Sequence, residues 1–221
     1  MFQNEPLQQL VTNDAAFLDA SLAALAVTAA NDDDALRGAL LAVLVNATNE
    51  NAPGCRHVGA SDDGAHLALV VRCVLDARAS FDSHVQAIAL LVNLIEHDRR
   101  NREALATITV NGFVDDNVED EAALDGDGDG DERLQSALLA VADLFEKEGE
   151  AGRNTTEERV RGAYQALLLA CAIKNCLPNE EILIGALDYP LIYVAKCGSR
   201  AARKGVRCRV EYHSDAVYRV S

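Results

Sequence analysis

Apolar residues recur at helical spacing along most of this chain. The pattern predicts helices at about 14–30, 32–49, 64–78, 81–97, 131–149, 156–175 and 179–197. Within 81–97 two separate apolar stripes are formed by Val85, Ile88, Leu91, Val92 and Ile95 and by Ala87, Leu90 and Leu94. A helix that is apolar on two sides is buried between neighbours, so this pattern indicates stacked helices.

A second helix shows the same breadth of apolar surface. Over 36–45, one apolar stripe is formed by Leu36, Leu40, Val43 and Leu44. It is widened by Leu41 and Val45. Start signals precede several helices: Asn13 and Asp14, Asn31 and Asp32, and the run from Thr155 to Glu158. Pro53-Gly54 and Pro178 indicate helix ends. The expected fold class is all-α.

Self-similarity extends the prediction from helices to repeats. Leu44-Val45-Asn46 recurs 47 residues later as Leu91-Val92-Asn93, which is within the period of armadillo and HEAT repeats. A further step of about 50 residues reaches Ala142-Asp143, and a fourth unit would centre on 167–171. The chain is therefore predicted to be an armadillo/HEAT-type helical-repeat solenoid, in which each unit packs on its neighbours.

Two charged segments interrupt this pattern. Ala104 to Glu132 contains no Lys or Arg, and it holds ten acidic residues. We expect 110–131 to be a disordered, flexible acidic loop, because such a segment buries too little apolar surface to stay ordered. The helical-repeat domain is predicted to span 1–197, and 198–221 is predicted to be a basic tail. Six basic residues cluster at its start and just before it: Lys196, Arg200, Arg203, Lys204, Arg207 and Arg209.

Composition narrows the function classes. Aromatic residues make up 5% of the chain, Trp is absent, and the apolar fraction is dominated by Ala and Leu, which favour helix. The formal charge of −15 argues against direct nucleic-acid binding, which needs a basic surface. Six cysteines without a CxxC pair predict buried thiols in a reducing compartment. We also expect no secretory signal and no membrane span, since apolar runs are broken well short of roughly 20 residues.

No pattern of residues predicts catalysis or a cofactor. Nucleophile motifs, phosphate-binding loops and dinucleotide fingerprints are missing, so we expect no enzyme and no small-molecule substrate. The Asp125–Gly130 run begins like a calcium-binding loop, but its twelfth position is Ser136 where a bidentate acid is required. A calcium-responsive module is therefore a minor alternative. Cys55, His57 and His66 match no zinc spacing, and no metal site is expected.

Asn46 and Asn93 are the first candidate binding residues. In armadillo-type solenoids an Asn near the end of such a helix can hold the backbone of an extended peptide. The alternative interpretation is that each Asn hydrogen-bonds a neighbouring turn.

Three segments resemble the C-terminal helical-repeat domain of the wings apart-like (WAPL) cohesin-release proteins. Residues 90–102, LLVNLIEHDRRNR, are similar to that family's "LLxNLVE…NR" segment. Residues 41–51, LAVLVNATNEN, resemble "LRVLLNLTHDN", and 163–171, AYQALLLAC, resemble "SYTALLLGC". The resemblance covers about 35 to 185 in the same order. The family's domain extends further on its N-terminal side, and the tail after about 185 has no counterpart.

The resemblance implies a non-enzymatic role in dissociating cohesin from chromatin. The implied partners are the cohesin ring subunits and their HEAT-repeat accessory proteins, in the nucleus and also in the cytoplasm. The segment at 90–102 carries the further predicted partner-binding residues Glu96, Arg99, Arg100 and Arg102. Charge reversal of the three arginines is expected to weaken binding without unfolding the domain. The alternative is a generic armadillo/HEAT scaffold that binds an extended peptide along Asn46 and Asn93.

Overall fold

A computed structural model describes residues 14–31, 33–60, 64–111, 134–150, 155–187, 210–211 and 219–220. Within these residues the chain is predominantly helical, as predicted. The helices are α2 (Ala15–Asn31), α3 (Asp34–Thr48), α4 (Ala52–Ala60), α5 (Ala65–Leu75), α6 (Phe81–Glu96), α7 (Arg99–Leu105), α8 (Ala137–Glu150), α9 (Thr156–Ile173) and α10 (Leu177–Ala186). No described helix combines the length and apolar character that crossing a bilayer requires.

Short antiparallel strands accompany the helices, and none was predicted. β1 (Thr109–Asn111) pairs with β2 (Leu134–Ser136), and β3 (Val210–Glu211) pairs with β4 (Arg219–Val220). Val110 and Asn111 therefore lie in a strand, which corrects the start of the predicted flexible loop at 110–131. The acidic residues of that loop, the Asp-rich run and almost all of the basic tail lie outside the described residues.

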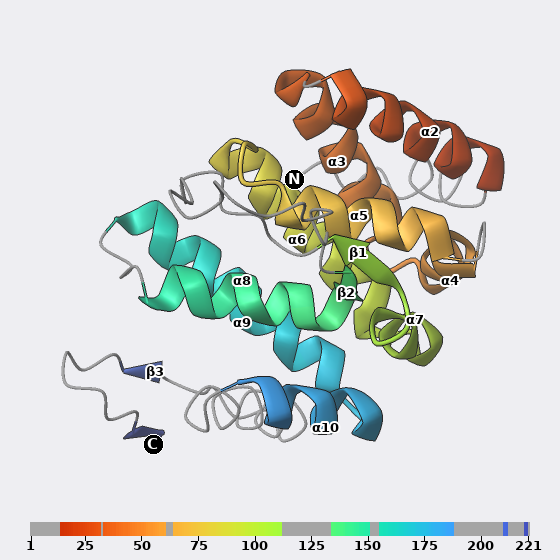
Figure 1. Cartoon of the computed structure of the whole chain (residues 1–221). Helices are drawn as coiled ribbons and strands as arrows, with labels where there is room; N and C mark the ends of the chain where they lie inside the picture. The colour runs from red at the N-terminus through yellow and green to blue at the C-terminus, as the bar shows by residue number, and fades with distance from the viewer. Residues whose placement is uncertain are drawn as a thin grey trace, which may run out of the picture.

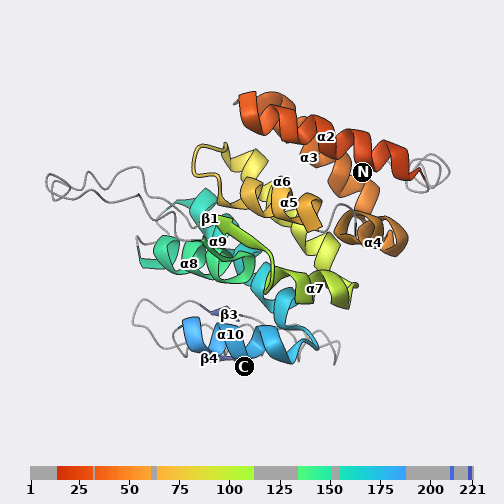
Figure 2. The same ribbon diagram turned by 45° about the vertical axis from the view of Figure 1, so that its right-hand side comes forward.

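The helices are arranged in layers that follow the chain from α2 to α10 (Figure 1, Figure 2). α3 packs on α6, and α6 packs on α9. α5 contacts α8, and the short helices α4 and α7 contact one another. Helices three places apart in the chain therefore occupy neighbouring layers. This arrangement corrects one prediction: Ala142-Asp143 lies on α8, beside α5, and the helix next to α6 is α9.

Side chains that cap the helices agree in part with the predicted start signals. Asp14 accepts hydrogen bonds from the backbone N–H groups of Ala16 and Phe17 at the start of α2. Thr155 forms a capping box with Glu158 at the start of α9. The cap of α3 is Asp33, one residue beyond the predicted signal. Pro53 does not end a helix but lies in the first turn of α4, where a missing N–H is tolerated.

Burial confirms the two-sided apolar pattern of α6. Leu90, Leu91, Leu94 and Ile95 are all within 1% of complete burial, because α3 and α9 cover opposite sides of this helix. The prediction for α3 was wrong in part. Leu41 and Leu44 are buried, but Leu36 and Val43 are 49% and 42% exposed. One side of α3 is therefore an exposed surface of the described structure.

Buried asparagines hold successive layers in register. Asn101 in α7 donates from Nδ2 to the carbonyls of Leu94 in α6 (2.8 Å) and Cys55 in α4 (2.9 Å). Asn179 in α10 repeats the arrangement one layer later, donating to Ala172 and Arg102. Both asparagines are 3% exposed or less. Each therefore joins the end of one long helix to the short helix of the preceding layer.

We expect Asn101→Ala to lower the free energy of unfolding by about 2 kcal/mol, because two buried carbonyls would lose their donor. Asn46→Ala is the control: the side chain of Asn46 is exposed, and it donates to Ala42 in its own helix. Its expected effect is within about 0.5 kcal/mol. Urea unfolding followed by circular dichroism measures both. Equal losses in the two variants would contradict this role for Asn101.

Candidate functional site

Asn46 and Asn93, the first predicted binding residues, have different surroundings. Asn93 is half-buried and donates from Nδ2 to the carbonyl of Val45 (3.0 Å) and to Oγ1 of Thr48 (3.2 Å). An amide has two N–H groups, so both donors of Asn93 are directed at α3. Asn46 is exposed, and its Nδ2 donates to the carbonyl of Ala42 (2.8 Å). The interpretation in which each Asn bonds a neighbouring turn therefore describes the geometry of both residues.

The residues predicted around α7 divide into exposed and buried members. Arg99 and Arg100 are exposed at the start of α7, and Arg99 pairs with Glu103 at 2.7 Å. Glu96, at the end of α6, is 3.7 Å from Lys174 Nζ in the α9–α10 turn. These side chains form a charged surface where the ends of α6 and α9 meet the start of α7.

Arg102 does not belong to that surface. It is 6% exposed, and its guanidinium donates to the carbonyls of Ile95 (2.6 Å) and Glu96 (2.9 Å) at the end of α6. A cation suits the negative end of a helix, so Arg102 stabilises α6. The prediction that its charge can be reversed without unfolding is therefore corrected. A carboxylate at this position would be buried against carbonyl oxygens.

A cleft of about 280 Å³ lies between α4 and α7 and includes one predicted residue, Arg100. The second arginine of the cleft, Arg56, was not predicted as a binding residue, because no helix was predicted at the position of α4. The 47-residue offset relates Arg56 to Glu103 and not to Arg100, so the repeat pattern gave no signal for this pair. The lining residues are Arg56, Gly59, Ala60, Gly64, Asp98, Arg100, Asn101, Ala104, Thr107 and Ile108.

Small residues shape this cleft. Gly59 lies so close to the Asn101 amide that a Cβ at this position would collide with it. Gly64, at the start of α5, has φ of 89°, a left-handed conformation that favours glycine. The cleft therefore depends on backbone positions that larger side chains would fill or distort.

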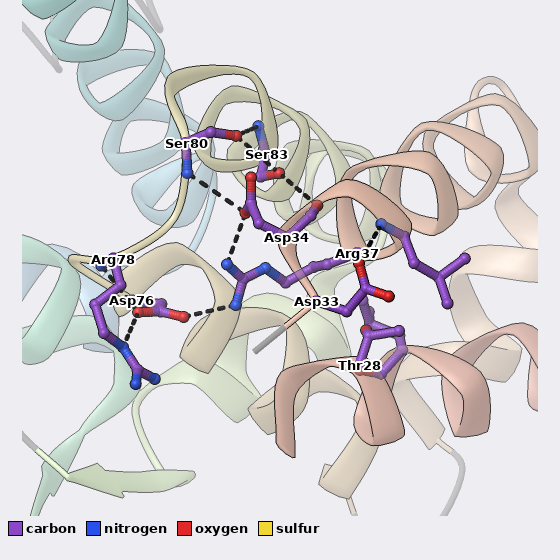
Figure 3. Close-up of polar contacts among 10 residues, drawn as sticks. Thr28, Asp33, Asp34, Arg37, Asp76, Arg78, Ser80 and Ser83 are labelled. Atoms are coloured by element: carbon purple, nitrogen blue, oxygen red, sulfur yellow. Dashed lines mark hydrogen bonds and ion pairs between the residues drawn. The ribbon is translucent and has the colours of Figure 1, made fainter. Parts of the chain in front are cut away.

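An ionic cluster around the buried Arg37 lies at the N-terminal end of α3 (Figure 3). The sequence did not indicate it. Arg37 is 2% exposed and donates at 2.7 Å to both Asp34 and Asp76. Hydrogen bonding by Ser80, opposed by burial and assisted by Arg37, lowers the pKa of Asp34 to about 2. Burial opposes the charge of Arg37, but the two carboxylates outweigh it and raise its pKa. These partners are internal, so the cluster is structural.

The described cysteines and histidines show no arrangement that would activate a nucleophile or hold a metal. Burial raises the pKa of Cys55, Cys73 and Cys171 to about 11, so these thiols are protonated at neutral pH. His57 is bonded to Asp19 at 2.7 Å and does not converge with Cys55 and His66. Among the described residues, no three His, Cys, Asp or Glu side chains are grouped to hold a metal ion.

Comparison with known proteins gives one distant similarity. No protein-family model matches the chain. The chain is 29% identical over 143 residues to the human protein named Wings apart-like protein homolog. The match covers 59% of this chain and 11% of the human protein, so the chain corresponds to a small part of that relative's length.

Proposed function

We propose that this chain is a non-enzymatic protein-binding module of the wings apart-like type, which engages cohesin in the nucleus and promotes its dissociation from chromatin. The observation that carries the proposal is the similarity to the human wings apart-like homolog over 143 residues. Its physical support is the placement of the three resembling segments, which lie on α3, on α6 and α7, and on α9. These helices pack on one another in series.

An armadillo-type array is the fold that we propose for this module. Units would consist of a short helix followed by two longer ones, as in α4–α5–α6 and α7–α8–α9. The packing of helices three places apart supports this assignment, as does the recurrence of the Asn101 contacts at Asn179. Such arrays present long surfaces to protein partners, in agreement with the proposed function.

The generic scaffold that clamps an extended peptide along Asn46 and Asn93 is less well supported. That mode needs side-chain amides that are available to a peptide backbone. Both N–H groups of Asn93 are directed at α3. The exposed charges Glu96, Arg99 and Arg100 are the better candidates for partner contact.

Affinity capture from nuclear extract tests the proposal. The tagged chain is expected to recover cohesin ring subunits or their HEAT-repeat accessory proteins, identified by mass spectrometry. The Arg99→Glu/Arg100→Glu double variant should recover about tenfold less, because it reverses two exposed charges without disturbing buried Arg102. Arg72→Glu, on exposed α5 surface, is the matched control and should capture as much as the unaltered chain.

Two results would overturn the proposal. One is the absence of every cohesin component in an extract from which a full-length wings apart-like protein recovers them. The other is equal loss of capture in the Arg72→Glu control, which would attribute the binding to net charge and not to the surface at α7.

A further inference from the structure

The cleft between α4 and α7 carries two arginines that form no ion pair among the described residues. Arg56 and Arg100 are both exposed and both line the cleft. Within the part of the chain that the structure describes, neither guanidinium forms an ion pair or a hydrogen bond. The chain has 35 acidic residues against 20 basic ones, so unpaired cations gathered at one cleft are not a consequence of composition.

Among the described residues, the acidic side chains of α7 and its cap make other contacts. Asp98 is 8% exposed, and its Oδ1 accepts hydrogen bonds from the backbone of Arg100 (2.9 Å) and Asn101 (3.1 Å) at the start of α7. Glu103 pairs with Arg99. Within the described part of the chain, the rim of the cleft therefore presents two guanidinium groups that are paired with no carboxylate.

Local stability does not explain the position of Arg100. The first turn of a helix carries partial positive charge, so cations are unfavourable there. The equivalent first-turn positions of α4 and α10 are occupied by Pro53 and Pro178, which suit a helix start. α7 departs from this pattern with Arg99 and Arg100. A residue that works against its own helix is better explained by what it binds.

The walls of the cleft are mainly apolar. Ala60, Ala104 and Ile108 line it together with Gly59 and Gly64. A volume of about 280 Å³ is just below the usual range for small-molecule pockets and suits one or two side chains of a peptide. The arrangement matches an apolar side chain in the cleft beside a carboxylate at its rim.

We infer that the α4–α7 cleft is a docking site for a short segment of a protein partner, with an Asp or Glu held between Arg56 and Arg100 and a neighbouring apolar side chain against Ala60 and Ala104. The inference deepens the proposed function and rests on it only in taking the ligand to be a protein. Nucleic acid is the poorer fit, because a net charge of −15 repels a polyanion and two arginines neutralise few phosphates.

Selection from a random library of short displayed peptides tests this site. The unaltered chain should enrich peptides that place Asp or Glu next to Leu, Ile or Val. A fluorescein-labelled copy of the most enriched peptide should bind about tenfold more weakly to Arg56→Glu/Arg100→Glu, since reversing two rim charges turns attraction into repulsion. Ala60→Leu should also weaken binding by filling the cleft without a change of charge. Arg72→Glu, away from the cleft, should bind normally.

Every other outcome overturns the inference. These outcomes are the enrichment of no peptide or only of neutral or basic peptides, equal affinity in the double variant, and tighter binding of a labelled single-stranded oligonucleotide. Cohesin capture distinguishes this failure from failure of the proposed function. Peptide binding without cohesin capture would refute only the proposed function. Cohesin capture that Arg56→Glu and Ala60→Leu leave unchanged would refute only the cleft.

Discussion

Replacing Arg37 with alanine is expected to lower the free energy of unfolding by about 3–5 kcal/mol. The guanidinium is 2% exposed and, among the described residues, is the one ionic partner that Asp34 and Asp76 share. Its removal leaves Asp34 without an ionic partner among the described residues and leaves Asp76 with the exposed Arg78, at 3.3 Å. Hydrogen bonds from Ser80 would remain on Asp34, but they do not neutralise its charge.

Urea unfolding at neutral pH measures this effect, and two comparisons isolate its cause. Arg72→Ala removes an exposed arginine and should change stability by no more than about 0.5 kcal/mol. Arg37→Met combined with Asp34→Asn and Asp76→Asn removes the charges together, and it should recover part of the loss, because no buried charge remains unpaired. A loss below about 1 kcal/mol for Arg37→Ala would show that the cluster contributes little.

Lowering the pH from 7 to about 4 is expected to destabilise the fold by on the order of 3 kcal/mol through His84 alone. Burial, assisted by the charge of Arg161 and opposed by Asp76, lowers the pKa of His84 from 6.5 to about 4. The unfolded chain therefore binds a proton below pH 6.5 that the folded chain does not bind until about pH 4. Stability from this residue is complete above pH 6.5 and is lost as the pH falls through this window.

His84→Leu is the variant that tests the assignment. Among the described residues, Nε2 of His84 has no hydrogen-bond partner, so leucine gives up no hydrogen bond at that nitrogen. The variant should unfold with nearly constant free energy between pH 6.5 and 4. Asp34, with its pKa lowered to about 2, loses its contribution only as the pH falls below its ordinary value of 3.8, outside this window. An unchanged slope in His84→Leu would assign the pH dependence to another group.

The candidate site could be predicted only in part from the sequence. Arg99 and Arg100 were predicted as binding residues and are exposed, although their role in binding remains a prediction. Arg102 was grouped with them because the three are close in sequence. Helix α7 turns this third arginine inward, toward the carbonyls that end α6. Arg56 was not considered, since only the contact between α4 and α7 brings it to the same cleft as Arg100.

The apolar pattern of the sequence predicted neither the short helices α4 and α7 nor the position of the third layer, and the reason is physical. α4 has nine residues and α7 has seven, which is too short for an apolar period to be recognised. The offset of 47 residues relates the helices α3 and α6, but Asn101 and Asn179 are 78 residues apart. The chain between β1 and β2 lengthens that interval, and a fixed period therefore pointed to α8 instead of α9.

The sequence by itself determined the helical class, the two buried sides of α6 and the capped start of α9, because apolar spacing and capping act within a few residues along the chain. Tertiary structure alone decided which charges are buried. Arg37 meets Asp76 across 39 residues of sequence, whereas Arg56 and Arg100 are exposed and form no ion pair within the described part of the chain. Nothing local distinguishes these arginines, since burial and pairing depend on which helices become neighbours.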